Sequence, residues 1–246
     1  MKLENLNEYI SYPLIAKYKE NGFLGLMSIV NGDVVLATKS TTQGDWKNYF
    51  QELWDRENAN IKMYLQEFAV KENCTIIFEV KSFKDKHLID FDKEELVILD
   101  VVKNSLKVNG VNIDINYSSK CLNEFKAYLE AYNNKIVRVV DTVAILNNFE
   151  DFKQLLEDYK YHAFEGFVFT DTKGFMFKWK SDFYNKWKRY RNILNLYKNN
   201  INQSFPYGRC STAEEVFFAK FLSTLDKDFV LNANIIEIRK KYYEDK

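Results

Sequence analysis

The chain has 246 residues, 46% hydrophobic and 16% aromatic, so it can bury a sizeable core as one large domain, with or without a small appendage. Lys plus Arg and Asp plus Glu balance at 35 each, which excludes a global positive field as the means of attracting nucleic acid. Three cysteines without a CxxC pair and only two histidines argue against a zinc site or a disulfide framework. No apolar run approaches the roughly 20 residues of a membrane helix, and no signal-peptide pattern is present, which predicts a cytoplasmic protein without a membrane partner.

Strands are predicted where apolar and β-branched residues alternate or cluster. Asn31-Gly32 separates two of these runs as a two-residue hairpin turn of the primed type, and residues 172–174 are expected to close another hairpin. Neighbouring strands are therefore expected to pair antiparallel. The predicted strands are residues 14–18, 23–30, 34–39, 75–80, 96–103, 136–143, 166–171 and 175–180.

Helices are predicted where apolar residues recur every three or four positions. After residue 180 strand character disappears and helical patterns fill the rest of the chain. The expected class is α+β, an antiparallel-sheet core with helices outside it and a small helical subdomain at the C-terminus. The boundary is expected between residues 1–190 and 191–246. The predicted helices are residues 46–54, 117–133, 149–159, 181–197, 212–226 and 232–243.

Lys19 and Gly22 lie in the segment Lys19-Glu20-Asn21-Gly22, which joins two predicted strands. Taken alone, this segment is explained just as well by a charged turn in which glycine supplies backbone freedom. Its meaning depends on polar residues at the ends of other strands.

Four more charged residues lie in otherwise apolar strands. Glu79 is inside the run 76–80, and Glu165 precedes Gly166 at the start of another strand. Lys178 and Lys180 share one face of the last predicted strand, because side chains alternate with period 2. For each residue alone, a solvated strand face is the plain alternative.

Together these residues form the set that covalent nucleotidyl transfer requires. A lysine amine attacks the α-phosphorus of a nucleotide only when it is neutral, so its pKa must be lowered by burial and nearby cations. Lys178 and Lys180 are expected to supply such cations and to stabilise charge on the α-phosphate. Glu79 and Glu165 are expected to hold Mg²⁺ (or Mn²⁺), directly or through water, or to bind ribose hydroxyls.

The order KENG, FEV, EGFVF, KWK resembles motifs I, III, IV and V of the covalent ligase and capping-enzyme superfamily, most closely the RNA ligase 1 family. The resemblance spans about residues 10–190 and implies an antiparallel-sheet nucleotidyltransferase domain of the ATP-grasp-like ligase type. It also implies that Lys39, after the first hairpin, and Tyr184, after KWK, contact nucleotide phosphates. The implied catalytic residues are Lys19, Glu79, Glu165, Lys178 and Lys180, and the implied nucleotide-binding set adds Gly22, Lys39 and Tyr184.

The function implied by this resemblance is ATP-dependent joining of 5′-phosphate and 3′-hydroxyl RNA ends, in RNA or tRNA repair. ATP adenylylates Lys19, AMP passes to the 5′-phosphate, and the 3′-hydroxyl then displaces AMP. The segment before Lys19 is shorter than in relatives, which puts the binding of the ATP phosphates in doubt. The resemblance leaves room for an RNA end-healing partner enzyme, which no residue of the chain specifies.

Two other functions stay open. One is a different covalent nucleotidyltransferase, either a DNA ligase or a GTP-using capping enzyme, because lysyl-AMP and lysyl-GMP chemistry share these residues. The other is a catalytically retired module that binds nucleotide or RNA. Cations alternate with aromatics in Lys186-Trp187-Lys188-Arg189-Tyr190-Arg191, which indicates either stacking on RNA or a helix with an aromatic core face.

Overall fold

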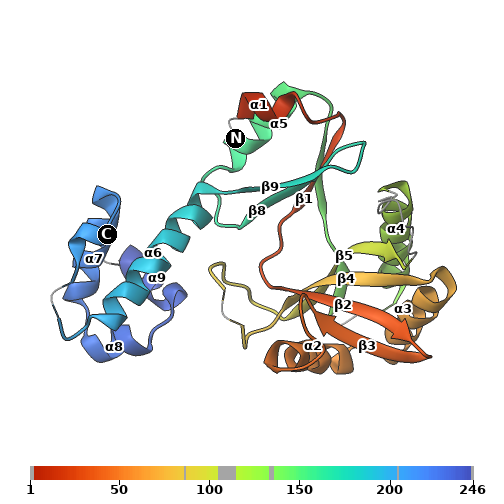
Figure 1. Cartoon of the computed structure of the whole chain (residues 1–246), viewed down its shortest axis with the longest axis horizontal. Coiled ribbons are helices and arrows are strands. Elements are labelled where there is room, and N and C mark those ends of the chain that lie inside the picture. Colours follow the sequence, from red (N-terminus) through yellow and green to blue (C-terminus); the bar gives the residue numbers. More distant parts are fainter. Residues whose placement is uncertain (1–2, 86, 105–114, 133–135, 204, 245–246) are drawn as a thin grey trace. The chain divides into compact units, whose positions relative to one another are not determined.

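The computed structural model describes residues 3–85, 87–104, 115–132, 136–203 and 205–244. The chain divides into two compact units, called unit 1 and unit 2, and most of their elements are labelled in Figure 1. Unit 1 comprises Met1–His87, Phe91–Leu155 and Gly166–Trp179, and unit 2 comprises Leu88–Asp90, Leu156–Glu165 and Lys180–Lys246.

A four-stranded sheet in unit 1 has the strand order β7-β1-β8-β9. Its central strand β1 pairs antiparallel with both β7 and β8, and Lys17 of β1 lies opposite Val168 of β8. Paired residues point to the same face of an antiparallel sheet, so Lys17 and Val168 share one face. The strands are β1 (Leu14–Tyr18), β7 (Thr142–Leu146), β8 (Gly166–Thr170) and β9 (Met176–Lys180).

A five-stranded sheet, also in unit 1, has the order β3-β2-β4-β5-β6. All neighbours are antiparallel except β5 and β6, which are parallel. Asn31 and Gly32 both have positive φ, 53° and 89°, which confirms the primed hairpin turn between β2 and β3. The strands are β2 (Phe23–Val30), β3 (Asp33–Thr38), β4 (Cys74–Lys81), β5 (Glu95–Lys103) and β6 (Val137–Val139).

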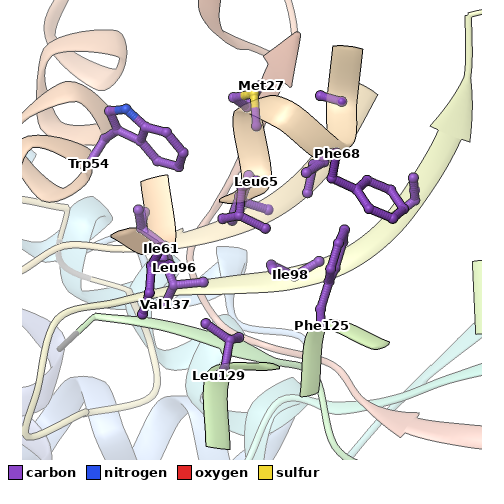
Figure 2. Packing of buried hydrophobic residues seen from close by; sticks show 14 of the residues in the cluster. Met27, Trp54, Ile61, Leu65, Phe68, Leu96, Ile98, Phe125, Leu129 and Val137 are labelled. Carbon is purple, nitrogen blue, oxygen red and sulfur yellow. The ribbon is translucent and has the colours of Figure 1, made fainter. Parts of the chain in front are cut away.

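Three helices pack against this second sheet: α2 (Asp45–Arg56), α3 (Ala59–Glu72) and α4 (Ile115–Ala131). Figure 2 shows the core between them, where Leu65 of α3 and Phe125 of α4 meet strand residues. Phe78 of β4 is fully buried in this core. Because successive residues of a strand point to opposite faces, Ile77 and Glu79 lie on the other face.

Two further helices belong to the sheet region: α1 (Leu3–Asn7) and α5 (Phe149–Tyr159). In unit 1, Phe152 of α5 packs edge-on against Phe169 of β8, with ring centroids 5.1 Å apart. This contact holds the start of α5 on the four-stranded sheet.

Unit 2 is built mainly from helices after β9. Trp187 and Tyr190 of α6 are almost completely buried against Phe218 and Tyr242, whereas Lys188 and Arg189 point to solvent. The alternation of cations and aromatics is therefore that of an amphipathic helix with an aromatic core face. The helices are α6 (Asp182–Asn199), the 3₁₀ turn η1 (Tyr207–Arg209), α7 (Ala213–Thr224), α8 (Lys227–Asn232) and α9 (Ile235–Glu244).

The α+β class with antiparallel sheets is confirmed, but several local predictions were wrong or incomplete. Neighbouring strands were expected to pair antiparallel, whereas β5 and β6 are parallel, because a long connection that contains α4 joins them instead of a tight hairpin. The predicted strand 136–143 is two strands in different sheets, because Val140 donates to the Ile98 carbonyl of one sheet and Asp141 accepts from the Tyr18 amide of the other. Helix α3 was not predicted, since its apolar residues surround the helix and leave Met63 and Val70 exposed.

Helix α6 runs without a break across residues 190 and 191, where the sequence placed a boundary, and the division into domains 1–190 and 191–246 stays a prediction. Within the described part of the chain, no helix combines the length and hydrophobicity needed to cross a membrane.

Candidate nucleotidyltransferase site

The turn Lys19–Gly22, which connects β1 to β2, is held at both ends in unit 1. The Lys19 amide donates to the Gly166 carbonyl at 2.8 Å, and the Gly22 amide donates to Oε1 of Glu79 at 2.8 Å. A Cβ on Gly22 would lie 2.2 Å from the Val80 carbonyl oxygen, so only glycine fits here. The structure thus brings three predicted residues together: Lys19, Gly22 and Glu79.

A second group of predicted residues meets in unit 2. Nζ of Lys180 lies 2.8 Å from Oε1 of Glu165 and 4.2 Å from the centre of the Tyr184 ring. The intervening Ser181 fixes this geometry. Its hydroxyl donates to the Phe164 carbonyl at 2.6 Å and accepts from the Tyr184 amide at 3.1 Å, capping helix α6.

The charge of Lys180 follows from these contacts. Burial lowers its pKa, but the hydrogen bond to Glu165 and the negative charge of that carboxylate outweigh burial, so the pKa lies above its ordinary value. Lys180 is therefore a cation at neutral pH. Such a cation is what the predicted nucleotidyl transfer requires.

Lys39 and Lys178 are both exposed in unit 1. Lys39 follows β3 at the rim of a pocket of about 490 Å³ that also includes Gly44 and Trp46 at the start of α2. Lys178 lies on the same face of β9 as Met176, which lines a different cavity.

That cavity, of about 290 Å³, lies between the facing surfaces of the two sheets of unit 1. Its walls are largely apolar, and polar groups enter it from β1, β5 and α4. Lys17 is among them, and burial lowers its pKa, an effect that Asp100 partly opposes. Asp100 accepts hydrogen bonds from the Ser118 hydroxyl and the Val101 amide. The lining includes Ile15, Lys17, Leu24, Ile77, Asp100, Ser118, Val168 and Thr170.

Lys17, Asp100 and Ser118 were not predicted from the sequence. Lys17 was the easiest of the three to find, because it is a charged residue inside the apolar strand 14–18, next to the turn that carries Lys19. No local pattern links Asp100 or Ser118 to either lysine.

The two predicted metal-binding residues carry oxygen donors that suit a hard cation, with Glu79 in unit 1 and Glu165 in unit 2. Mg²⁺ is usually held by one or two carboxylates together with water and substrate phosphates, not by a protein cage. The described residues contain no cluster of three or more His, Cys, Asp or Glu side chains suited to a metal. Each carboxylate, taken by itself, has donor chemistry that suits such a cation.

Solved structures with a similar fold include ATP-dependent ligases. An archaeal ATP-dependent RNA ligase matches with a TM-score of 0.54 and 14% identity, over 98% of this chain and 58% of that one. A Naegleria gruberi RNA ligase variant matches with a TM-score of 0.55 and 16% identity, over 75% of this chain and 55% of that one. A putative ATP-dependent DNA ligase from Aquifex aeolicus matches with a TM-score of 0.52 and 15% identity, over 99% and 64%. The chain thus spans between half and two thirds of the length of these relatives.

No sequence among curated proteins matches the chain. A family profile described as RNA ligase, in contrast, matches residues 1–188. The matched range contains the turn Lys19–Gly22, both glutamates and the residues from Lys178 to Tyr184. The chain therefore belongs to the RNA ligase family.

Proposed function

We propose that the chain is an ATP-dependent RNA ligase that joins 5′-phosphate and 3′-hydroxyl RNA ends, with Lys19 as its nucleophile. The observation that carries the proposal is the turn Lys19–Gly22, anchored by the Gly166 carbonyl and the Glu79 carboxylate, in a chain of the RNA ligase family. An anchored turn limits the positions of the Lys19 side chain, which lowers the entropy lost on reaching the attack geometry.

In the first step, neutral Nζ of Lys19 attacks the α-phosphorus of ATP. A phosphorus–nitrogen bond forms, the bond to the β-phosphate oxygen breaks, pyrophosphate leaves, and the nitrogen loses a proton. Lys180, a cation paired with Glu165, is assigned to the α-phosphate oxygens, whose negative charge grows in the transition state.

In the second step, an oxygen of the RNA 5′-phosphate attacks the phosphorus of lysyl-AMP, and the lysine leaves as an amine. In the third step, the RNA 3′-hydroxyl attacks the 5′-phosphorus of the adenylylated end, AMP leaves, and a phosphodiester bond forms. Both steps use the same kind of charge stabilisation as the first, so one set of cations can serve all three.

We assign Lys39, Lys178 and Tyr184 to the nucleotide phosphates, and Glu79 and Glu165 to a divalent cation, Mg²⁺ or Mn²⁺. When bound, the cation neutralises phosphate charge and orients pyrophosphate as leaving group. We further assign the adenine ring to the 290 Å³ cavity, whose apolar walls suit an aromatic ring.

We place this activity in the cytoplasm, in the repair of broken RNA or tRNA ends. An enzyme that restores the required 5′-phosphate and 3′-hydroxyl groups would complement it there.

The test is transfer of label from ATP to the protein. Purified protein is incubated with Mg²⁺ and α-labelled ATP or GTP and denatured, and the polypeptide is examined for covalent label. Lys19→Ala is the test variant. Lys71→Ala, which changes an exposed lysine of α3, is the matched control. Label from ATP is expected in wild type and in Lys71→Ala but absent in Lys19→Ala.

Each other outcome points to a different function. Label from GTP alone would favour a capping enzyme, and sealing of DNA ends in preference to RNA ends would favour a DNA ligase. Label that persists in Lys19→Ala would refute the assignment of the nucleophile. Folded protein that binds ATP but never carries label would be a nucleotide-binding module.

A further inference from the structure

A compact ionic network in unit 1 lies against the turn that carries Lys19. Arg138 of β6 donates from one terminal guanidinium nitrogen to Glu20 at 2.7 Å and from Nε to Glu95 at 3.0 Å. Lys81 of β4 lies 2.7 Å from Glu95 and 3.6 Å from Glu20. Two cations and two carboxylates therefore form a closed ring of ion pairs next to the nucleophile.

The ring is shielded from water, which distinguishes it from ordinary surface ion pairs. The exposed fractions of the side chains are 10% for Glu20, 5% for Glu95, 12% for Lys81 and 26% for Arg138. Burial raises the pKa of Glu95, but hydrogen bonds from Arg138, Lys81 and Lys93 together have a larger effect in the opposite direction. The pKa of Glu95 is therefore lowered to about 2. Glu95 therefore stays ionised over the neutral range, and buried ion pairs resist screening by salt.

The ring adds a third anchor to the turn. The backbone anchors at Lys19 and Gly22 hold its two ends, while the side chain of Glu20 holds its middle. Arg138 is suited to this task because its planar fork contacts two carboxylates from two directions, which fixes orientation as well as distance.

The pairing of Glu20 with cations also affects the reaction of the adjacent Lys19. Glu20 directly follows the nucleophile, and an unpaired carboxylate there would favour the charged ammonium of Lys19, which cannot attack. In the ring, two cations face this carboxylate and offset its charge.

We propose that Arg138, assisted by Lys81, is a positioning residue for lysine adenylylation. It holds Glu20 so that the turn Lys19–Gly22 keeps its shape and the negative charge of Glu20 stays paired. This inference rests on the proposed function, since it concerns the first step of that reaction. Neither Arg138 nor Lys81 needs to contact the nucleotide.

The test separates the first step from the last. Lysyl-AMP formation is followed in single turnover across ATP concentrations, and sealing is followed with RNA that already carries a 5′-adenylyl group, which bypasses attack by Lys19. The variants are Arg138→Met, Arg138→Lys and Glu20→Gln. The matched control is Arg56→Met, which removes a guanidinium from an ion pair with Glu94 that lies outside the ring. Thermal unfolding of every variant reports on the fold.

Arg138→Met is expected to slow lysyl-AMP formation at saturating ATP by roughly 10- to 100-fold, the size expected when a reacting group is displaced by about 1 Å. The ATP concentration for half-maximal rate and the sealing of pre-adenylylated RNA should change less than about 3-fold. Arg138→Lys should recover part of the rate. Glu20→Gln, nearly the same size as the native side chain, should slow the same step, and Arg56→Met should match wild type.

Three results would overturn the inference in different ways. Equal adenylylation rates in wild type, Arg138→Met and Glu20→Gln would refute it alone. Parallel loss of both steps together with lower thermal stability in both Arg138→Met and Glu20→Gln would reduce the ring to a purely structural role. Absence of label in wild type would overturn the proposed function, and this inference with it.

Discussion

Replacement of Gly22 by alanine tests the geometry of the turn with one methyl group. The added Cβ would lie 2.2 Å from the Val80 oxygen, 2.8 Å from the Val80 carbonyl carbon and 3.2 Å from Cγ of Glu79. Ordinary contact requires the turn to move by roughly 1 Å, since carbon atoms pack at about 3.5–4.0 Å. The Val80 carbonyl cannot yield easily, because Val80 is paired with Phe23 in the ladder between β2 and β4.

The movement should cost both stability and rate. Overpacking of this kind costs about 1–3 kcal/mol, which corresponds to a fall in melting temperature of roughly 2–12 °C for a chain of this size. The same movement lengthens the 2.8 Å bond from the Gly22 amide to Glu79 and shifts Lys19. A shift of about 1 Å reduces the rate by on the order of 100-fold.

The assays are lysyl-AMP formation with labelled ATP and thermal unfolding followed by circular dichroism. Gly208→Ala is the matched control, because a Cβ at Gly208 has nothing within 4 Å. The control should match wild type in both assays. Wild-type rates of lysyl-AMP formation in Gly22→Ala, in protein that melts normally, would refute the claim that the turn has no room to move.

Three further predictions concern unit 1. Burial depresses the pKa of Lys17 in the folded state, so the unfolded chain binds more protons. Lys17→Met should therefore have a higher free energy of unfolding than wild type at pH 7, by about 1.4 kcal/mol for each pH unit by which the pKa is depressed. This difference in stability should disappear as the pH rises to about 10.4. A difference that does not change with pH in urea titrations would contradict this. Glu57→Ala should lower the free energy of unfolding by about 1–3 kcal/mol for each of the Ile136 and Val137 amides that loses its acceptor, and Glu57→Gln should lower it less. Chemical-denaturation curves equal to that of wild type would disprove the role of these hydrogen bonds. Cys74 is buried and its pKa is raised to about 11, so mass spectrometry should find it alkylated by iodoacetamide only after denaturation.

Much of the fold was predictable because its signals are local. The strand from Leu14 to Tyr18, the primed turn at Asn31-Gly32 and the start of helix α6 near residue 181 each depend on residues a few positions apart. The failures have a physical cause as well. A continuous β-branched run does not show where the chain leaves one sheet for another, so residues 136–143 were assigned to one strand instead of β6 and β7.

The sequence by itself determined the family and the chemical groups proposed for the reaction: a lysine in a short turn, carboxylates on strands and a pair of lysines on one strand face. These signals survive without a structure because each depends on neighbouring residues and on the fixed periodicity of a strand.

The tertiary structure alone decided the surroundings of those groups. It placed Lys17 with Asp100 at one cavity, closed a ring around Glu20 with Arg138, and fitted Gly22 against Val80. In each case the partners are far apart in the chain and belong to different elements of the fold. Their proximity depends on how sheets and helices pack, and that information is spread over the whole core instead of any single motif.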